Sequence, residues 1–280
     1  MRALSRVTLF VFCFVLSAVV TDFLLRSDFN FKNFPFFKKQ NQTQFDDFLP
    51  NVKQEKVYVP ILMYHHIALK RPQDSYYVSP EIFEKQMQWI SDNNYKVISF
   101  DDFYQVLLGK KELPEKPVII TFDDGVDDQY NNALPILQKF GYTATFFIKL
   151  NNVGPDKGGM TYAMLRKLVA AKMTIGSHSM NHDNMKNMSE TQMEYELTQS
   201  KKILENQLKI KVDYFSYPGG AYSDTTVDKT KEAGYLAAMT TKHEVYHQIK
   251  TKDDLYKISR IHIDDEMPSF ENWVKGINLK

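Results

Sequence analysis

Apolar and polar positions alternate along residues 56–280 in blocks that predict strands separated by helices. Short apolar runs rich in β-branched and aromatic residues are typical of buried strands. Such runs occur at 57–64, 95–99, 118–122, 143–150, 173–175, 213–217, 235–240 and 257–263. Apolar residues at helical spacing predict helices at 80–90, 101–108, 131–140, 161–171, 191–208, 225–233 and 270–277. The pattern therefore indicates an α/β domain.

Several helix boundaries carry local signals. Ser79, followed by Pro80, is a good helix start, and Thr161 and Ser189 are placed to cap the helices that follow them. Gly141 is placed to end the helix at 131–140. Strands that alternate with helices imply right-handed βαβ units and a parallel sheet. Seven or eight repeats of the pattern favour a closed barrel over an open sheet, with the functional site at the carboxyl ends of the strands.

The amino-terminal part has a different pattern. Residues 7–20 are almost wholly apolar and follow two arginines, which is typical of a signal peptide or signal anchor. No small-residue cleavage site is evident, so we favour an uncleaved anchor over 1–26, a spacer over 27–55 and one globular domain over 56–280. This arrangement predicts that the bulk of the protein works outside the cytoplasm, membrane-anchored or secreted, with the membrane as a partner.

Composition narrows the possible functions. The net charge is +1 and no Lys/Arg cluster forms a phosphate-binding face, so the sequence gives no indication of nucleic-acid binding. Cys13 is the only cysteine, which excludes an intrachain disulfide and a cysteine-based metal site. A hydrophobic content of 43% is ample for a large core.

Reactive residue types stand at the predicted carboxyl ends of four strands: His65, Asp123-Asp124, His178 and Tyr217-Pro218-Gly219. Two adjacent carboxylates at the end of a buried strand are costly unless a metal ion or a catalytic task compensates them. A plain Asp-Asp-Gly turn that ends the strand is the alternative.

The pair His178 and His182 adds to the signal, because residues four apart on a helix or helical turn face the same way and can share a metal. With Asp124 they make a His₂Asp set suited to one divalent ion, with zinc favoured and cobalt or nickel as alternatives. Asp123 would then be close enough to take a proton from a bound water.

Residues 243–247 match the zinc-protease motif H-E-x-x-H. That motif requires a long amphipathic helix, whereas this segment follows a predicted strand and precedes a polar stretch. We expect a solvated loop with two incidental histidines.

The motifs at 121–125 (T-F-D-D-G), 178–182 (H-S-M-N-H) and 215–220 (F-S-Y-P-G-G) resemble those of the polysaccharide deacetylase (NodB-homology) family, over about residues 57–265. The resemblance implies a distorted (β/α) barrel of about seven strands. It implies Asp123 as catalytic base, the three residues Asp124, His178 and His182 as metal ligands, and substrate or oxyanion contacts at Tyr217 and Gly219.

Two departures from the family pattern affect the site. Ser216 stands where the family usually has an arginine that orients the base, and we expect Arg260 to replace it. The usual late histidine motif is unclear, although His262 is a candidate. The segment 63–67 (M-Y-H-H-I) resembles an early motif of the poly-N-acetylglucosamine deacetylases, which implies His65 as general acid and a structural role for His66.

The resemblance implies an enzyme that removes N-acetyl groups from an N-acetylglucosamine polysaccharide and releases acetate. The substrate would be either poly-β-1,6-N-acetylglucosamine or peptidoglycan. An O-deacetylase of xylan or another acetylated glycan, and an inactive carbohydrate-binding surface protein, remain the alternatives.

Overall fold

The computed structural model describes residues 56–69 and 74–276. The predicted anchor (1–26) and the predicted spacer (27–55) lie outside the described residues. The described residues form one compact unit. Among the described residues, no helix combines the length and the apolar character needed to span a bilayer.

Seven parallel strands form the main sheet, and an eighth, β5 (Lys96–Val97), pairs with the first part of β6. In spatial order the seven strands are β10 (Ala237–Met239), β9 (Tyr214–Ser216), β8 (Thr174–Ser177), β7 (Thr145–Ile148), β6 (Pro117–Phe122), β2 (Ile61–Tyr64) and β12 (Ile261–His262). An isolated parallel bridge between Met239 and Ile258 links β10 to the segment that leads into β12, so the curled sheet approaches closure. The predicted distorted barrel of about seven strands is confirmed.

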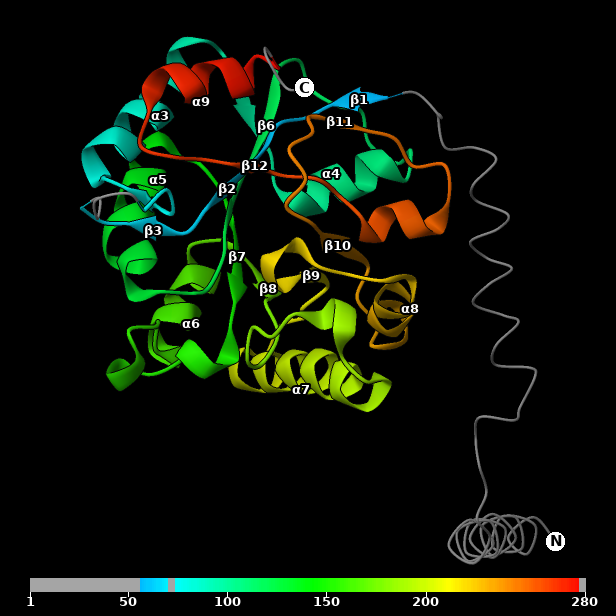
Figure 1. Cartoon of the computed structure of the whole chain (residues 1–280). Helices are drawn as coiled ribbons and strands as arrows, with labels where there is room; N and C mark the ends of the chain where they lie inside the picture. The colour runs from blue at the N-terminus through cyan, green and yellow to red at the C-terminus, as the bar shows by residue number, and fades with distance from the viewer. Residues whose placement is uncertain (1–55, 70–73, 277–280) are drawn as a thin grey trace, which may run out of the picture. The chain divides into compact units, whose positions relative to one another are not determined.

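The helices lie around the outside of the sheet (Figure 1). They are α3 (Pro80–Asp92), α4 (Phe100–Leu107), α5 (Leu134–Phe140), α6 (Tyr162–Ala170), α7 (Glu190–Leu208), α8 (Asp224–Glu232) and α9 (Met267–Val274). Two small sheets flank the barrel: antiparallel β1 (Val57–Tyr58) with β11 (Tyr246–His247), and parallel β3 (His66–Ile67) with β4 (Tyr77–Val78).

The predicted helix boundaries hold for local reasons. The hydroxyls of Ser79, Thr161 and Ser189 each accept a hydrogen bond from the backbone N–H of the third residue of the helix that follows. Gly141 takes the left-handed conformation that ends α5. The predicted helix at 131–140 is in fact two elements, a π-turn at Gln129–Ala133 followed by α5.

The central strand β6 is buried along all six residues, as its continuous apolar run predicts. Its one polar side chain, Thr121, donates a 2.8 Å hydrogen bond to Leu62 O of the neighbouring strand. The ring of Phe122 stacks on Phe146 of β7 with ring centroids 4.7 Å apart. This packing fixes the end of β6, where the two aspartates follow.

Candidate active site

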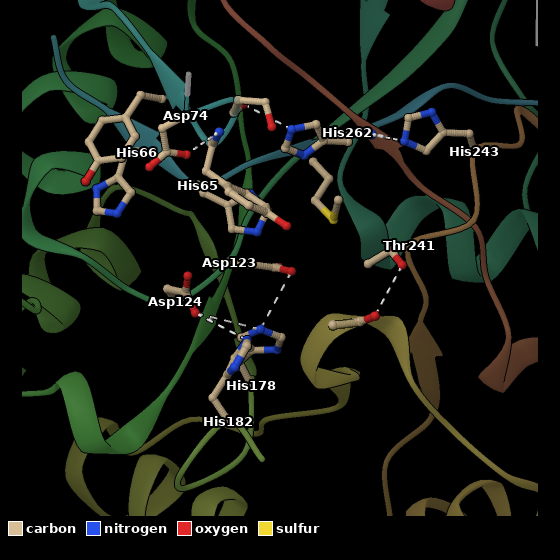
Figure 2. A pocket seen from close by; sticks show the side chains of 15 residues that line it. His65, His66, Asp74, Asp123, Asp124, His178, His182, Thr241, His243 and His262 are labelled. Carbon is tan, nitrogen blue, oxygen red and sulfur yellow. Dashed lines mark hydrogen bonds and ion pairs between the residues drawn. The ribbon is translucent and has the colours of Figure 1, made fainter. Parts of the chain in front are cut away.

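A cavity of about 580 Å³ opens at the carboxyl ends of the strands. Its lining includes residues that follow β2, β6 and β8, namely His65, Asp123, Asp124 and His178, together with His182. Figure 2 shows the side chains of Asp124, His178 and His182 on one side of the cavity, with His65 and His262 on the other. The strand ends that the sequence singled out therefore meet at one place.

Asp124, His178 and His182 converge on a common point. Asp124 Oδ1 lies 3.9 Å from His178 Nε2 and 3.7 Å from His182 Nε2, and one donor atom from each residue lies within 4.8 Å of the others. Ligands about 2 Å from a tetrahedral ion are roughly 3.3 Å apart, so a small contraction would complete the set. One carboxylate and two imidazoles fit a divalent ion such as zinc, with room left for water or substrate.

The tautomer of His178 suits a metal ligand. Its Nδ1 lies 2.8 Å from Ser216 O, and a carbonyl only accepts, so Nδ1 carries the hydrogen. Nε2 then presents its lone pair to Asp124 and His182. This outer hydrogen bond fixes the ring in the orientation that a ligand needs.

The segment that carries the two histidines is an irregular loop and not the predicted helical turn. Ser179 and His182 both have positive φ, at 66° and 68°. The buried carboxylate of Glu196 on α7 holds this loop: it accepts from the backbone N–H groups of Met180 and Asn181 at 2.8 and 2.9 Å. The histidines meet through this clamp and not through helical spacing. Sequence reasoning missed Glu196, because only its place on α7 brings it under the loop.

Asp123 lies beside the ligand set but is bound to Arg260. Arg260 donates two parallel hydrogen bonds of 2.7 Å to the carboxylate, and Ser216 Oγ donates a third of 3.1 Å. Burial alone would raise the pKa of Asp123, but the charge and hydrogen bonds of Arg260 hold that pKa well below its usual value. Asp123 is therefore a carboxylate at all ordinary pH values.

Arg260 occupies the place that the sequence analysis expected for it. Its side chain is fully buried, and it also donates to Thr121 Oγ1 and to Thr240 O. Ser216 Oγ accepts a 2.7 Å hydrogen bond from the same guanidinium. The guanidinium thus reaches Asp123 from the segment before β12, while the short Ser216 side chain leaves it room.

His65 lies across the cavity from the ligand set. Its ring packs edge-to-face on Tyr76 at 4.6 Å and lies 5.7 Å from the ring of His262. Burial lowers the pKa of His65 to about 4, against the opposite effect of Asp123 and Asp124. Its Nδ1 is buried without a hydrogen-bond partner in the described part of the chain.

The comparisons with known proteins agree with this geometry. A sequence model described as polysaccharide deacetylase matches residues 110–238. YxkH of Bacillus subtilis, named as a polysaccharide deacetylase, is 33% identical over 204 residues, which are 72% of this chain and 72% of YxkH. This chain belongs to the polysaccharide deacetylase family.

Two further relatives support the assignment of this deacetylase. The structure of Streptococcus pyogenes deacetylase PplD in complex with acetate matches with a TM-score of 0.72 and 29% identity, over 80% of this chain and 100% of PplD. A poly-β-1,6-N-acetyl-D-glucosamine N-deacetylase of Staphylococcus aureus is 28% identical over 216 residues, 72% of each chain.

In this polysaccharide deacetylase Gly219 lines the cavity, as predicted, but Tyr217 does not. The side chain of Tyr217 is fully buried and stacks on Tyr222, and its backbone N–H donates to Met239 O at 3.1 Å. The side chain of Tyr217 therefore serves the packing beneath the site, and the expected substrate or oxyanion contact at Tyr217 stays a prediction.

His66 and His262 also line the cavity of the deacetylase. His66 Nδ1 lies 2.7 Å from Asp128 Oδ2, and its ring stacks on Tyr77 at 4.2 Å, in keeping with a structural role. His262 Nε2 lies 3.0 Å from Ser75 O, which only accepts, so this nitrogen carries a hydrogen. The early candidate, His65, and the late candidate, His262, are neighbours, with their ring centroids 5.7 Å apart.

The H-E-x-x-H match is not a metal site in this deacetylase. The segment forms no helix, and Tyr246–His247 is strand β11. The predicted solvated loop is wrong for His247, which is buried and donates from Nε2 to Val59 O at 3.0 Å. His243 is exposed at the rim of the cavity.

Proposed function

We propose that this protein is a metal-dependent N-deacetylase that removes acetyl groups from N-acetylglucosamine units of a cell-surface polysaccharide. The observation that carries the proposal is the convergence of Asp124, His178 and His182 beside the Asp123–Arg260 ion pair. A divalent ion held by those three residues would polarise the acetyl carbonyl and lower the pKa of a bound water from about 15.7 to about 7.

The residues around the ligand set have distinct roles in the proposed reaction. Asp123 takes a proton from the attacking water, and Arg260 holds its carboxylate in place. The backbone N–H near Gly219, which lines the cavity, would contact the oxyanion. The C–N bond then breaks, and the products are acetate and a glucosamine unit.

The departing nitrogen needs a proton, which we assign to His65. Since the pKa of His65 is lowered to about 4, its ring is neutral in the free protein near pH 7. The proton that leaves the water must therefore reach the nitrogen through His65 during turnover. The proton count then balances: one proton leaves the water and one arrives on the amine.

We favour poly-β-1,6-N-acetylglucosamine over peptidoglycan as the substrate. Two features support this choice: the early M-Y-H-H-I motif and the named activity of the Staphylococcus aureus relative. We also propose that the enzyme works outside the cytoplasm at a bacterial surface, held by residues 1–26. Fractionation of cells that express the full chain, compared with a chain lacking residues 1–26, tests the location.

Acetate release tests the activity. The full chain is stripped with chelator, reloaded with Zn²⁺, Co²⁺ or Ni²⁺, and assayed on β-1,6-linked N-acetylglucosamine oligosaccharides, peptidoglycan glycan strands and acetylated xylan. We expect metal-dependent release from the first substrate, loss of release and of bound metal in Asp124→Ala, and neither loss in Asp127→Ala, at an exposed position of the same turn. Metal-dependent release of acetate from acetylated xylan alone would mean that the protein is an O-deacetylase. If the protein binds metal but releases no acetate from any substrate, a carbohydrate-binding protein is favoured.

A further inference from the structure

The π-turn that follows the aspartate pair contains side chains that grip the strand end bearing His65. Asp128, Gln129 and Asn132, here called the clasp, lie within or next to the π-turn Gln129–Ala133. Single π-turns inside helices are rare and occur often at functional sites. The proposed catalytic reaction assigns no role to the clasp.

Gln129 joins the two strand ends. Its Nε2 donates to His65 O at 2.8 Å and also to Asp123 O. The side chain is fully buried, and its Oε1 has no partner among the described residues. Rotating the amide would place Oε1 against two carbonyl oxygens, so the donor orientation is fixed. One amide group therefore ties the backbone of the proposed acid to the backbone of the proposed base.

Asp128 and Asn132 hold the two residues that follow His65. Asp128 accepts from Ile67 N at 2.9 Å and pairs with His66 Nδ1 at 2.7 Å. Asn132 Nδ2 donates to Ile67 O at 2.7 Å. These contacts and those of Gln129 make five polar interactions from the clasp, four of them to residues 65–67.

His65 lies between two strands and belongs to neither, because β2 ends at Tyr64 and β3, which pairs with β4, begins at His66. Strand β2 stops at Tyr64, so the ladder of the main sheet does not extend to His65. Among the described residues, nothing hydrogen-bonds Nδ1 of the His65 ring to set its orientation, in contrast to His178, whose Nδ1 is bonded to Ser216 O. The place of the His65 ring is therefore set by its backbone and by packing against Tyr76.

We propose that the clasp positions His65 relative to Asp123, so that the proton donor and the base act on the same acetamide group. This inference rests on the proposed N-deacetylase function. The clasp residues are positioning residues, which act through His65. Their loss should lower kcat, because a displaced donor weakens proton transfer, and it should leave KM little changed.

A double-mutant cycle tests the inference. Gln129→Met removes the amide at nearly constant volume, and acetate release is measured in the wild-type and His65→Ala backgrounds of the metal-loaded full chain. We expect kcat to fall about tenfold in the first background and less than twofold in the second, because the His65 side chain is already absent. Equal losses in both backgrounds would overturn the proposal.

Gln86→Met is the matched control. Gln86 is also a fully buried glutamine, bonded to Tyr64 Oη and to Asp264 O, but within the described part of the chain it forms no hydrogen bond with residues 65–67. We expect Gln86→Met to lose as much thermal stability as Gln129→Met. Its kcat should fall by the same factor in the wild-type and His65→Ala backgrounds. Asp128→Asn, which keeps an acceptor for Ile67 N, should retain kcat within about threefold, and Asp128→Ala should not.

A second measurement does not depend on activity. The His65 ring signal in a histidine NMR spectrum, assigned by its loss in His65→Ala, should shift in Gln129→Met and stay in place in Gln86→Met. If the wild-type protein releases no acetate, the proposed function fails, and this spectrum alone decides whether the clasp positions His65. An unchanged His65 signal in Gln129→Met would overturn the inference.

Discussion

Arg260 and Asp123, 137 positions apart in the sequence, form a bidentate ion pair with both N–O distances at 2.7 Å. The pair is fully enclosed: Arg260 is 0% and Asp123 2% exposed. It sets the charge of the proposed base, and it fixes the direction in which that base faces the ligand set.

Replacing Arg260 with lysine should lower kcat roughly 10- to 100-fold with little change in KM. A lysine ammonium keeps the charge but cannot donate two parallel hydrogen bonds to one carboxylate, so Asp123 loses its fixed orientation. Steady-state acetate release measures the effect. Wild-type kcat in a folded Arg260→Lys protein would show that the bidentate grip is not needed.

A variant that exchanges Ser216 and Arg260 provides a control for the Arg260→Lys result. Ser216 occupies the position where the family usually has an arginine, and its Oγ already contacts both Asp123 and Arg260. Ser216→Arg in an Arg260→Ser background restores a guanidinium from the other strand. Its kcat should exceed that of Arg260→Ser alone.

Asp123→Asn should fold and bind metal but release at least 100-fold less acetate. The amide cannot accept the proton of the water, and general-base catalysis contributes about 10²–10⁴ in rate. Thermal stability should fall as well, since Arg260 loses its buried counter-charge. Metal content and acetate release, measured on the same preparation, check the prediction, and near-normal turnover would remove Asp123 as the base.

Glu196→Gln should weaken metal binding about 10- to 100-fold, the usual cost of losing an outer-shell partner. The carboxylate accepts from two backbone N–H groups and from Asn181 Nδ2, and the new amide would place a donor against one of these donors. Competition with a metal chelator measures the affinity. Glu194→Gln, on an exposed face of the same helix, is the control and should bind metal like the wild type.

The pH dependence of kcat/KM should follow a neutral His65. Because burial lowers its pKa to about 4, the ring is protonated only below about pH 4 and is neutral above it. Activity should therefore fall as the pH drops through 4 and should not decline between pH 5.5 and 7. If kcat/KM instead declined tenfold for each unit of pH above 4, the active form of the free enzyme would be the one with His65 protonated.

His247→Gln should reduce the loss of stability in acid. Burial lowers the pKa of His247 to about 4, below its ordinary value of 6.5, so the unfolded chain binds the proton first as the pH falls. The neutral ring thus contributes stability at pH 7 that is lost between about pH 6.5 and 4. Urea unfolding measures the free energy of unfolding at pH 7 and 4.5. Its drop between these two pH values should be smaller by about 2 kcal/mol in His247→Gln than in the wild type. The exposed His243→Gln, in the same segment, should behave like the wild type.

The sequence by itself determined the strands, most helix boundaries and the residues at the strand ends. These features depend on neighbours in the chain: β-branched runs make buried strands, serine and threonine hydroxyls cap helices, and a parallel sheet brings its carboxyl ends together. The meeting of Asp124 with His178 follows from that topology, and the family motifs added Asp123 and His65.

Only the tertiary structure decided how those residues are held. Glu196 and Gln129 act on segments 15 and 64 positions away, and no local pattern records such contacts. Arg260 was expected only because Ser216 stands where the family has an arginine, and the structure alone gives its bidentate contact with Asp123, 137 positions away. The helical turn expected for the two histidines was wrong because a buried carboxylate stabilises an irregular loop with positive φ angles. Tyr217 turned away from the cavity because its ring fills the space beside Tyr222. Local sequence fixes which groups reach the site, and long-range packing fixes their orientation.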